Sequence, residues 1–167
     1  HENSSAASDV YKRQAIGQQA MQGSSTPANN TGTGNIAIGQ NAGKGITCGC
    51  ENVFIGKDVA GIGTYSRRNV VIGWEAASAA AFAGGYSTII GPAAGKNLLG
   101  GSNNVFIGRS AGHCVTTGQR NTYVGDFAGG WGTGDAKTGN DNTSVGNMSG
   151  YKLSGAADRN TFLGPYA

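Results

Sequence analysis

The chain has 167 residues, a net charge of +3 and only 13% charged residues. Its 31 glycines exceed the roughly twelve expected at average usage, while three prolines are too few for collagen or a proline-rich linker. The Lys and Arg residues do not cluster as in nucleic-acid-binding proteins, and no run of eighteen apolar residues predicts a membrane span. The composition therefore favours one domain of ordered, glycine-punctuated backbone.

The first fourteen residues do not follow the pattern of the rest. Residues 4–14, Ser-Ser-Ala-Ala-Ser-Asp-Val-Tyr-Lys-Arg-Gln, resemble translated sequencing-adapter read-through. We expect residues 1–14 to be non-native or irregular. We expect residues 15–167 to form a single repeat domain of about nine coils, belonging to a longer protein, so the lack of a visible signal peptide decides nothing.

A repeat begins at Ile16-Gly17 and runs to Leu163-Gly164, with an aliphatic residue before a glycine in each copy and 17 to 22 residues between copies. An asparagine stands four residues before that glycine in most copies, and Ser87 replaces it once. These asparagines are Asn35, Asn52, Asn69, Asn104, Asn121, Asn142 and Asn160. Stacked amides in such a column can form a hydrogen-bonded ladder, although Asn also simply favours turns.

Each unit reads as a short strand followed by a turn. The segment from the asparagine to the aliphatic residue is β-branched and too short for a helix. Glycine tolerates positive φ and marks a corner after each strand. The corner glycines are Gly39, Gly56, Gly73, Gly91, Gly108, Gly125, Gly146 and Gly164. A weaker apolar position, at Ile46, Leu98, Val115 and Leu153, indicates a second strand in each coil.

The pattern predicts an all-β, parallel β-solenoid with coils of 17 to 18 residues, two strands per coil and no helix longer than about two turns. Residues three before and one before the corner glycine are expected to face the interior. The residue two before it then faces outward, because neighbours in a strand point to opposite sides. This proposed self-association column is Phe54, Val71, Ile89, Phe106, Tyr123 and Phe162.

The segments Asn104-Val-Phe-Ile-Gly-Arg-Ser-Ala-Gly112 and Asn121-Thr-Tyr-Val-Gly-Asp-Phe-Ala-Gly129 resemble repeats of phage tail-fibre and bacterial fibre proteins. They are also similar to the head repeats of trimeric autotransporter adhesins, whose unit is shorter. The resemblance implies a homotrimeric fibre shaft exposed outside the cell, on the cell surface or on a virion. It carries over no receptor-binding residue, and a glycan or receptor would be contacted by a part outside this chain.

Signals for catalysis or metal binding are weak. The three cysteines, Cys48, Cys50 and Cys114, form neither a disulfide framework nor a zinc motif. Cys50 and Cys114 lie four coils apart, so we expect no bond between them within a chain. His113 precedes Cys114, but a strand would place the two side chains on opposite faces. We therefore expect no catalytic residues, no cofactor and no metal.

Other motifs in the chain have simpler explanations. Residues 129–135 resemble a calcium-binding nonapeptide in a single imperfect copy, which favours an insertion in a longer coil. Glycosylation sequons occur at Asn3, Asn29, Asn142 and Asn147, and Asn142 is expected to be inward or paired because it belongs to the asparagine column.

Three functions remain open. We expect a structural fibre or filament segment that associates with itself, without nucleic acid or membrane insertion. A hexapeptide-type left-handed β-helix acyltransferase is an alternative, but such enzymes need an aliphatic residue every six positions and a catalytic histidine. An ice-binding solenoid is the third, but the four threonines that would contribute are expected to share the inward position with Val and Ile. They are Thr88, Thr122, Thr143 and Thr161.

Overall fold

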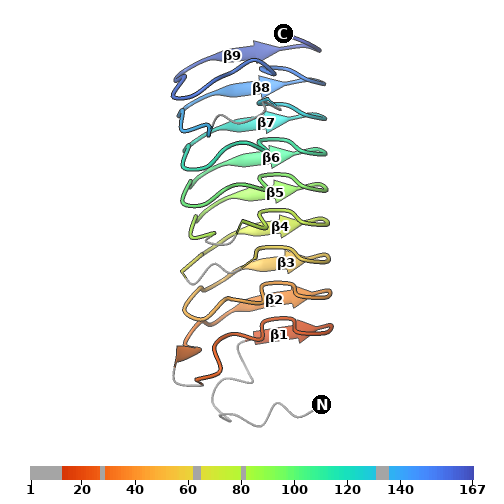
Figure 1. The fold of residues 1–167 in the computed structure, drawn as a ribbon, viewed down its shortest axis with the longest axis vertical. Helices are drawn as coiled ribbons and strands as arrows, with labels where there is room; N and C mark the ends of the chain where they lie inside the picture. Colours follow the sequence, from red (N-terminus) through yellow and green to blue (C-terminus); the bar gives the residue numbers. More distant parts are fainter. Residues whose placement is uncertain (1–12, 27–28, 62–64, 80–81, 131–135) are drawn as a thin grey trace.

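The computed structural model describes residues 13–26, 29–61, 65–79, 82–130 and 136–167. Within these ranges, nine strands form one parallel sheet in chain order (Figure 1). The strands are β1 (Arg13–Ile16), β2 (Asn35–Ile38), β3 (Val53–Ile55), β4 (Val70–Ile72), β5 (Thr88–Ile90), β6 (Val105–Ile107), β7 (Thr122–Val124), β8 (Thr143–Val145) and β9 (Thr161–Leu163). The described residues thus form an all-β, parallel β-solenoid, with β1 and β9 at opposite ends of a rod.

The strands stack with equivalent residues of the repeat side by side. For example, Phe54 of β3 pairs with Val71 of β4, and Ile89 of β5 pairs with Phe106 of β6. The same alignment holds in all eight strand pairs. Each column of the sequence repeat is therefore a column in space, with a rise of about 4.8 Å per coil.

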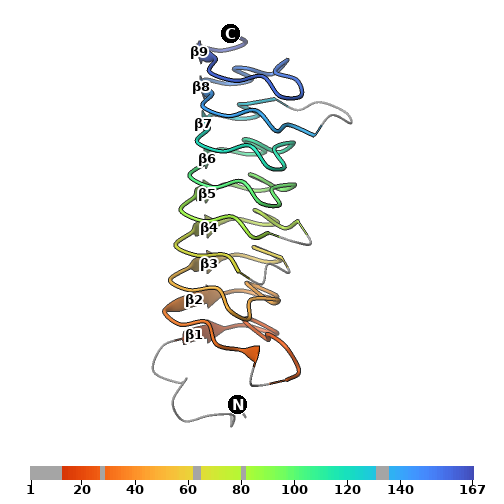
Figure 2. The same ribbon diagram turned by 90° about the vertical axis from the view of Figure 1, so that its left-hand side faces the viewer.

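The sheet lies along one side of the rod and the turns lie along the other (Figure 2). The expected second strand of each coil is absent from the described residues. Ile46, Leu98 and Val115 are buried and Leu153 is partly buried, but Ile46, Leu98 and Leu153 lie in irregular backbone, and Val115 makes only an isolated bridge with Lys137. The physical reason is backbone conformation, since left-handed residues recur two and four positions after the corner glycine and interrupt an extended chain.

The described residues contain no α-helix, so the prediction of no long helix is confirmed there. The corner glycines explain part of this. Their φ angles lie between 126° and 135° from Gly17 to Gly146 and reach 106° at Gly164, a region that other residues rarely adopt. A Cβ on each corner glycine up to Gly146 would also collide with the backbone of the equivalent glycine in the next coil. Both constraints act in every coil.

The interior is filled by the column that was expected to face outward. Phe54, Val71, Ile89 and Phe106 are fully buried, Tyr123 is 2% exposed, and Phe162 is half-buried in the last strand. The predicted orientation of this column was therefore wrong. The strand alternates as expected, but the coil closes over the opposite face. The rings of Phe106 and Tyr123 stack within this core, 5.3 Å apart and 10° from parallel.

We predict that Gly91→Ala lowers the free energy of unfolding by about 3 kcal/mol or more, because it combines an unfavourable φ with a backbone collision. Gly91 has φ +133°, and its Cβ would lie 2.5 Å from the Gly108 carbonyl oxygen. Gly100→Ala is the matched control, since no atom lies within 4 Å of the added Cβ. Urea unfolding of both variants measures the difference, and equal stabilities would contradict the stacking constraint.

Candidate functional site

The asparagine column is a buried hydrogen-bonded ladder along the rod axis. Asn52 shows the full pattern: its Nδ2 donates to Asn35 Oδ1 at 2.9 Å and to the Ser66 carbonyl at 2.9 Å. Its Oδ1 accepts from the backbone N–H and from Nδ2 of Asn69, at 3.0 and 3.1 Å. Both ends of the amide are thus satisfied, which removes the desolvation penalty of burying it.

The ladder depends on a second glycine column that the sequence analysis missed. Three residues before the asparagine lie Gly32, Gly49, Gly84, Gly101, Gly118 and Gly139, with Ser66 and Ala157 as exceptions. The carbonyls of Gly49, Gly84, Gly118 and Gly139 accept the Nδ2 protons of the ladder, as in Asn104 to Gly118 and Asn121 to Gly139, both at 2.9 Å. A Cβ on these six glycines would strike a carbonyl of the next coil. The fixed spacing of this glycine from the asparagine was the available signal.

Ser87 interrupts the ladder. Its backbone N–H donates to Asn69 Oδ1 at 2.9 Å, so the column reaches it from below. Its short hydroxyl accepts from the Asn104 N–H at 3.1 Å and donates to the Gly85 carbonyl at 3.3 Å. A serine side chain is shorter than asparagine and has one proton to donate, so the contact with the next coil is reduced at this point.

The outward-facing residues are the two positions that flank the buried one, and we call them the outer face. One column lies three residues before the corner glycine: Ile36, Val53, Val70, Thr88, Val105, Thr122, Thr143 and Thr161. The other lies one residue before it: Ile38, Ile55, Ile72, Ile90, Ile107, Val124, Val145 and Leu163. All are half-buried or exposed; Ile38, Ile107 and Val145 are 37–38% exposed. The four threonines therefore face outward, and the expectation that they share an inward position with Val and Ile was wrong.

Ion pairs between successive coils flank the outer face. Arg109 pairs with Asp126 through two hydrogen bonds of 2.9 and 2.7 Å, and Arg120 pairs with Asp141 at 2.6 and 3.0 Å. These hydrogen bonds from arginine lower the pKa of both carboxyl groups. Because the groups are exposed to solvent, the pairs contribute little to stability and mainly decide which charges stand beside the face.

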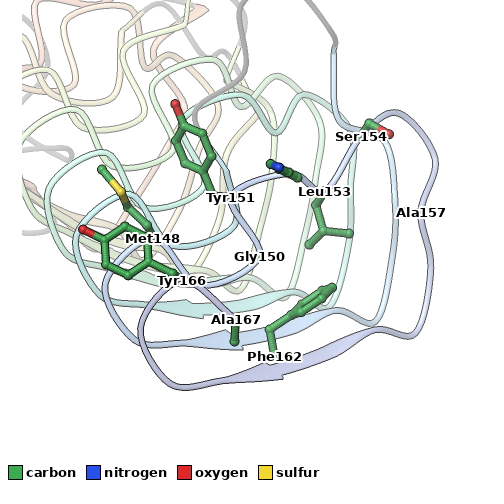
Figure 3. Close-up of a pocket in the computed structure, with 10 residues that line it drawn as sticks. Met148, Gly150, Tyr151, Leu153, Ser154, Ala157, Phe162, Tyr166 and Ala167 are labelled. Carbon is green, nitrogen blue, oxygen red and sulfur yellow. The ribbon is translucent and has the colours of Figure 1, made fainter.

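A hollow of about 610 Å³ lies at the C-terminal end of the rod (Figure 3). Leu153 and Phe162, residues of the core columns, lie beside it. It is the uncovered end of the interior rather than a cleft between elements. A second, polar depression of about 370 Å³ lies over the turns, where Lys96 forms an ion pair with Glu75 at 2.7 Å.

Cysteine and histidine chemistry is limited in the described residues. Cys48, Cys50 and Cys114 form no disulfide in the described residues, which agrees with the expectation for Cys50 and Cys114. Cys114 Sγ lies 3.6 Å from His113 Nδ1; the expected separation of these neighbours was wrong because they lie in a turn, not a strand. Burial, and then the charge of Lys96, lower the pKa of His113.

No group of three or more His, Cys, Asp or Glu residues that could hold a metal occurs in the described ranges. In the same ranges, no helix is long and apolar enough to cross a membrane. Of the sequons, Asn142 is buried in the ladder, as expected, while Asn29 and Asn147 are exposed. Asn3, residues 4–12 of the adapter-like segment and residues 131–135 of the calcium-like motif lie outside the described residues.

Comparison of the chain with protein-family models, curated proteins and solved structures finds no match. The assignment of a function therefore depends on the outer face and the regular stacking beneath it.

We predict that Ser87→Asn stabilises the protein by about 1 kcal/mol, because the new amide can donate to the Gly101 carbonyl and accept from Asn104. The reverse change within the ladder, Asn121→Ser, should destabilise it by a similar amount or more, since the Gly139 carbonyl then loses its buried donor. Chemical denaturation measures both variants. A stability loss in Ser87→Asn would contradict the proposed role of the ladder.

Proposed function

We propose that this chain is a structural segment of an extracellular or virion fibre, and that copies of it associate through the outer face. The observation that carries the proposal is the exposure of two continuous columns of Ile, Val, Leu and Thr along eight strands. Neither column contains a charged residue. The largest apolar patch on a typical monomer is roughly 300–600 Å² and often marks an interaction site, which this strip resembles in size.

The size of the outer face supports association of modest strength. Its eight strands, each about 4.8 Å wide, give a length of roughly 38 Å, and three residues across give a width of roughly 10 Å. The resulting area, roughly 400 Å² per copy, is about half of what a standard interface buries on each partner. At about 25 cal/mol per Å², it would contribute roughly 10 kcal/mol before the cost of association.

The internal structure suits a shaft. Every coil repeats the same ladder and the same corner, so stiffness increases with the number of coils and needs no special site. A rod of this kind would hold a binding region away from a surface. The similarity of the repeat units to fibre proteins and trimeric adhesins agrees with this role, and a location outside the cell or on a virion is part of the proposal.

We predict that the double change Ile38→Asp with Ile107→Asp dissociates the assembly, because it places carboxylates in an apolar contact. Leu99→Asp is the matched control, since Leu99 is 40% exposed but lies in a turn outside the face, against 38% and 37% for the two isoleucines. Light scattering gives the mass, and circular dichroism verifies the fold. A monomeric wild-type protein, or a double variant that keeps the wild-type mass, would refute the proposal.

A second candidate function is ice binding, favoured by the outward orientation of Thr88, Thr122, Thr143 and Thr161 on a regularly spaced parallel sheet. The neighbouring column of Ile and Val makes it the weaker candidate. If the protein binds ice, the wild type should show thermal hysteresis at concentrations where it is monomeric. The double change Thr122→Lys with Thr143→Lys should abolish that hysteresis. Absence of hysteresis in the wild type would eliminate this function.

A further inference from the structure

The two edges of the outer face carry exposed side chains that differ from coil to coil. The entry edge lies just before the ladder position and comprises Glu51, Arg68, Tyr86, Asn103, Arg120 and Asp141. The exit edge lies just after the corner glycine and comprises Lys57, Trp74, Pro92, Arg109, Asp126 and Asn147. These residues are exposed, except that Asp126 and Asp141 are half-buried. Each strand from β3 to β8 separates one entry residue from one exit residue.

Symmetry decides which edges meet. If two or three copies surround an axis parallel to the rod, the entry edge of one copy lies beside the exit edge of the next, at the same height. If two copies pack antiparallel, each edge instead meets its own equivalent in reversed order. The edge residues therefore distinguish these arrangements, although the apolar columns between them do not.

In the parallel, unshifted arrangement, three of the six coils from β3 to β8 bring complementary edge residues together. Glu51 meets Lys57 and Arg120 meets Asp126, two pairs of opposite charge. Arg68 meets the exposed indole of Trp74, a cation–π partner. The remaining pairs are Tyr86 with Pro92, Asn103 with Arg109, and Asp141 with Asn147. No like charges meet.

A shift of one coil in one direction brings Arg68 to Lys57, Arg120 to Arg109 and Asp141 to Asp126, which are three repulsive pairs. A shift in the other direction keeps neither opposite-charge pair. The antiparallel arrangement centred on β6 is the nearest competitor. On the entry edge it pairs Arg68 with Asp141, and Glu51 with Arg159 of the last coil, but it places Arg109 against its own equivalent on the exit edge.

We propose that the outer face binds a second copy of this chain in parallel, without a shift between coils, and that the entry and exit edges select this register. This inference rests on the proposed self-association. Exposed charges add little affinity, but like-charge contacts exclude wrong arrangements effectively. The edges also enlarge the contact beyond the apolar strip, which alone is small for a stable interface.

The test uses disulfide cross-linking in a background with Cys48→Ser, Cys50→Ser and Cys114→Ala. Chains carrying Asn103→Cys and chains carrying Arg109→Cys are refolded together and oxidised. In the proposed register these residues of adjacent copies meet, and the mixture should cross-link. A mixture of Asn103→Cys with Trp74→Cys, two coils away, should cross-link about tenfold less, because the separation exceeds the roughly 7 Å that a disulfide tolerates.

Each chain alone gives the decisive control. In the parallel arrangement two copies of Asn103→Cys lie across the face from each other and do not cross-link, whereas the antiparallel arrangement links them. Tyr86→Cys with Pro92→Cys repeats the test one coil below. An oligomer that cross-links through Asn103→Cys alone, or through the offset pair, overturns the register and leaves the proposed function intact. A monomer by light scattering overturns both.

Discussion

The structure depends on the close, unshifted stacking of equivalent backbone positions in successive coils. At a rise of about 4.8 Å there is room for a hydrogen bond between coils but not for a Cβ directed along the axis. Gly91 beneath Gly108, and Gly118 beneath Gly139, are the places where the chain meets this limit. Two glycine columns and one asparagine column follow from this single constraint.

The asparagine ladder extends the sheet around a corner where backbone pairing ends. Asn121 Oδ1 accepts from the Asn142 N–H at 3.0 Å, and its Nδ2 donates to the Gly139 carbonyl at 2.9 Å. The side chain thus joins two points of the next coil that face the interior and would otherwise be unsatisfied. This explains why a buried polar column coexists with a core of Phe, Val, Ile and Leu.

The division between core and outer face has a functional consequence. The buried column varies from Ala37 to Phe54 and Ser144, and residues outside the strands, such as Phe82, also contribute to the interior. The outer columns are far more uniform, mainly Ile, Val and Thr. A uniform face suits a repeated contact with an identical copy, while the varied edges can define its register. The two parts of the surface therefore have separate roles in the proposed fibre.

The repeat length, the strand positions, the corner glycines and the asparagine column were all readable from the sequence, because each occupies a fixed place in every coil. The inward face was not. A strand's alternation separates Phe54 from Val53 and Ile55 but leaves open which side is enclosed. Asn52 and Phe54 point to the same side of the strand, so a buried asparagine ladder implies a buried Phe54. Which side is buried is decided only when the coil closes. The sequence also did not show that each coil has a single strand. Left-handed residues such as Asp58 and Ala60 interrupt the second strand, and their conformation is imposed by stacking rather than by residue type.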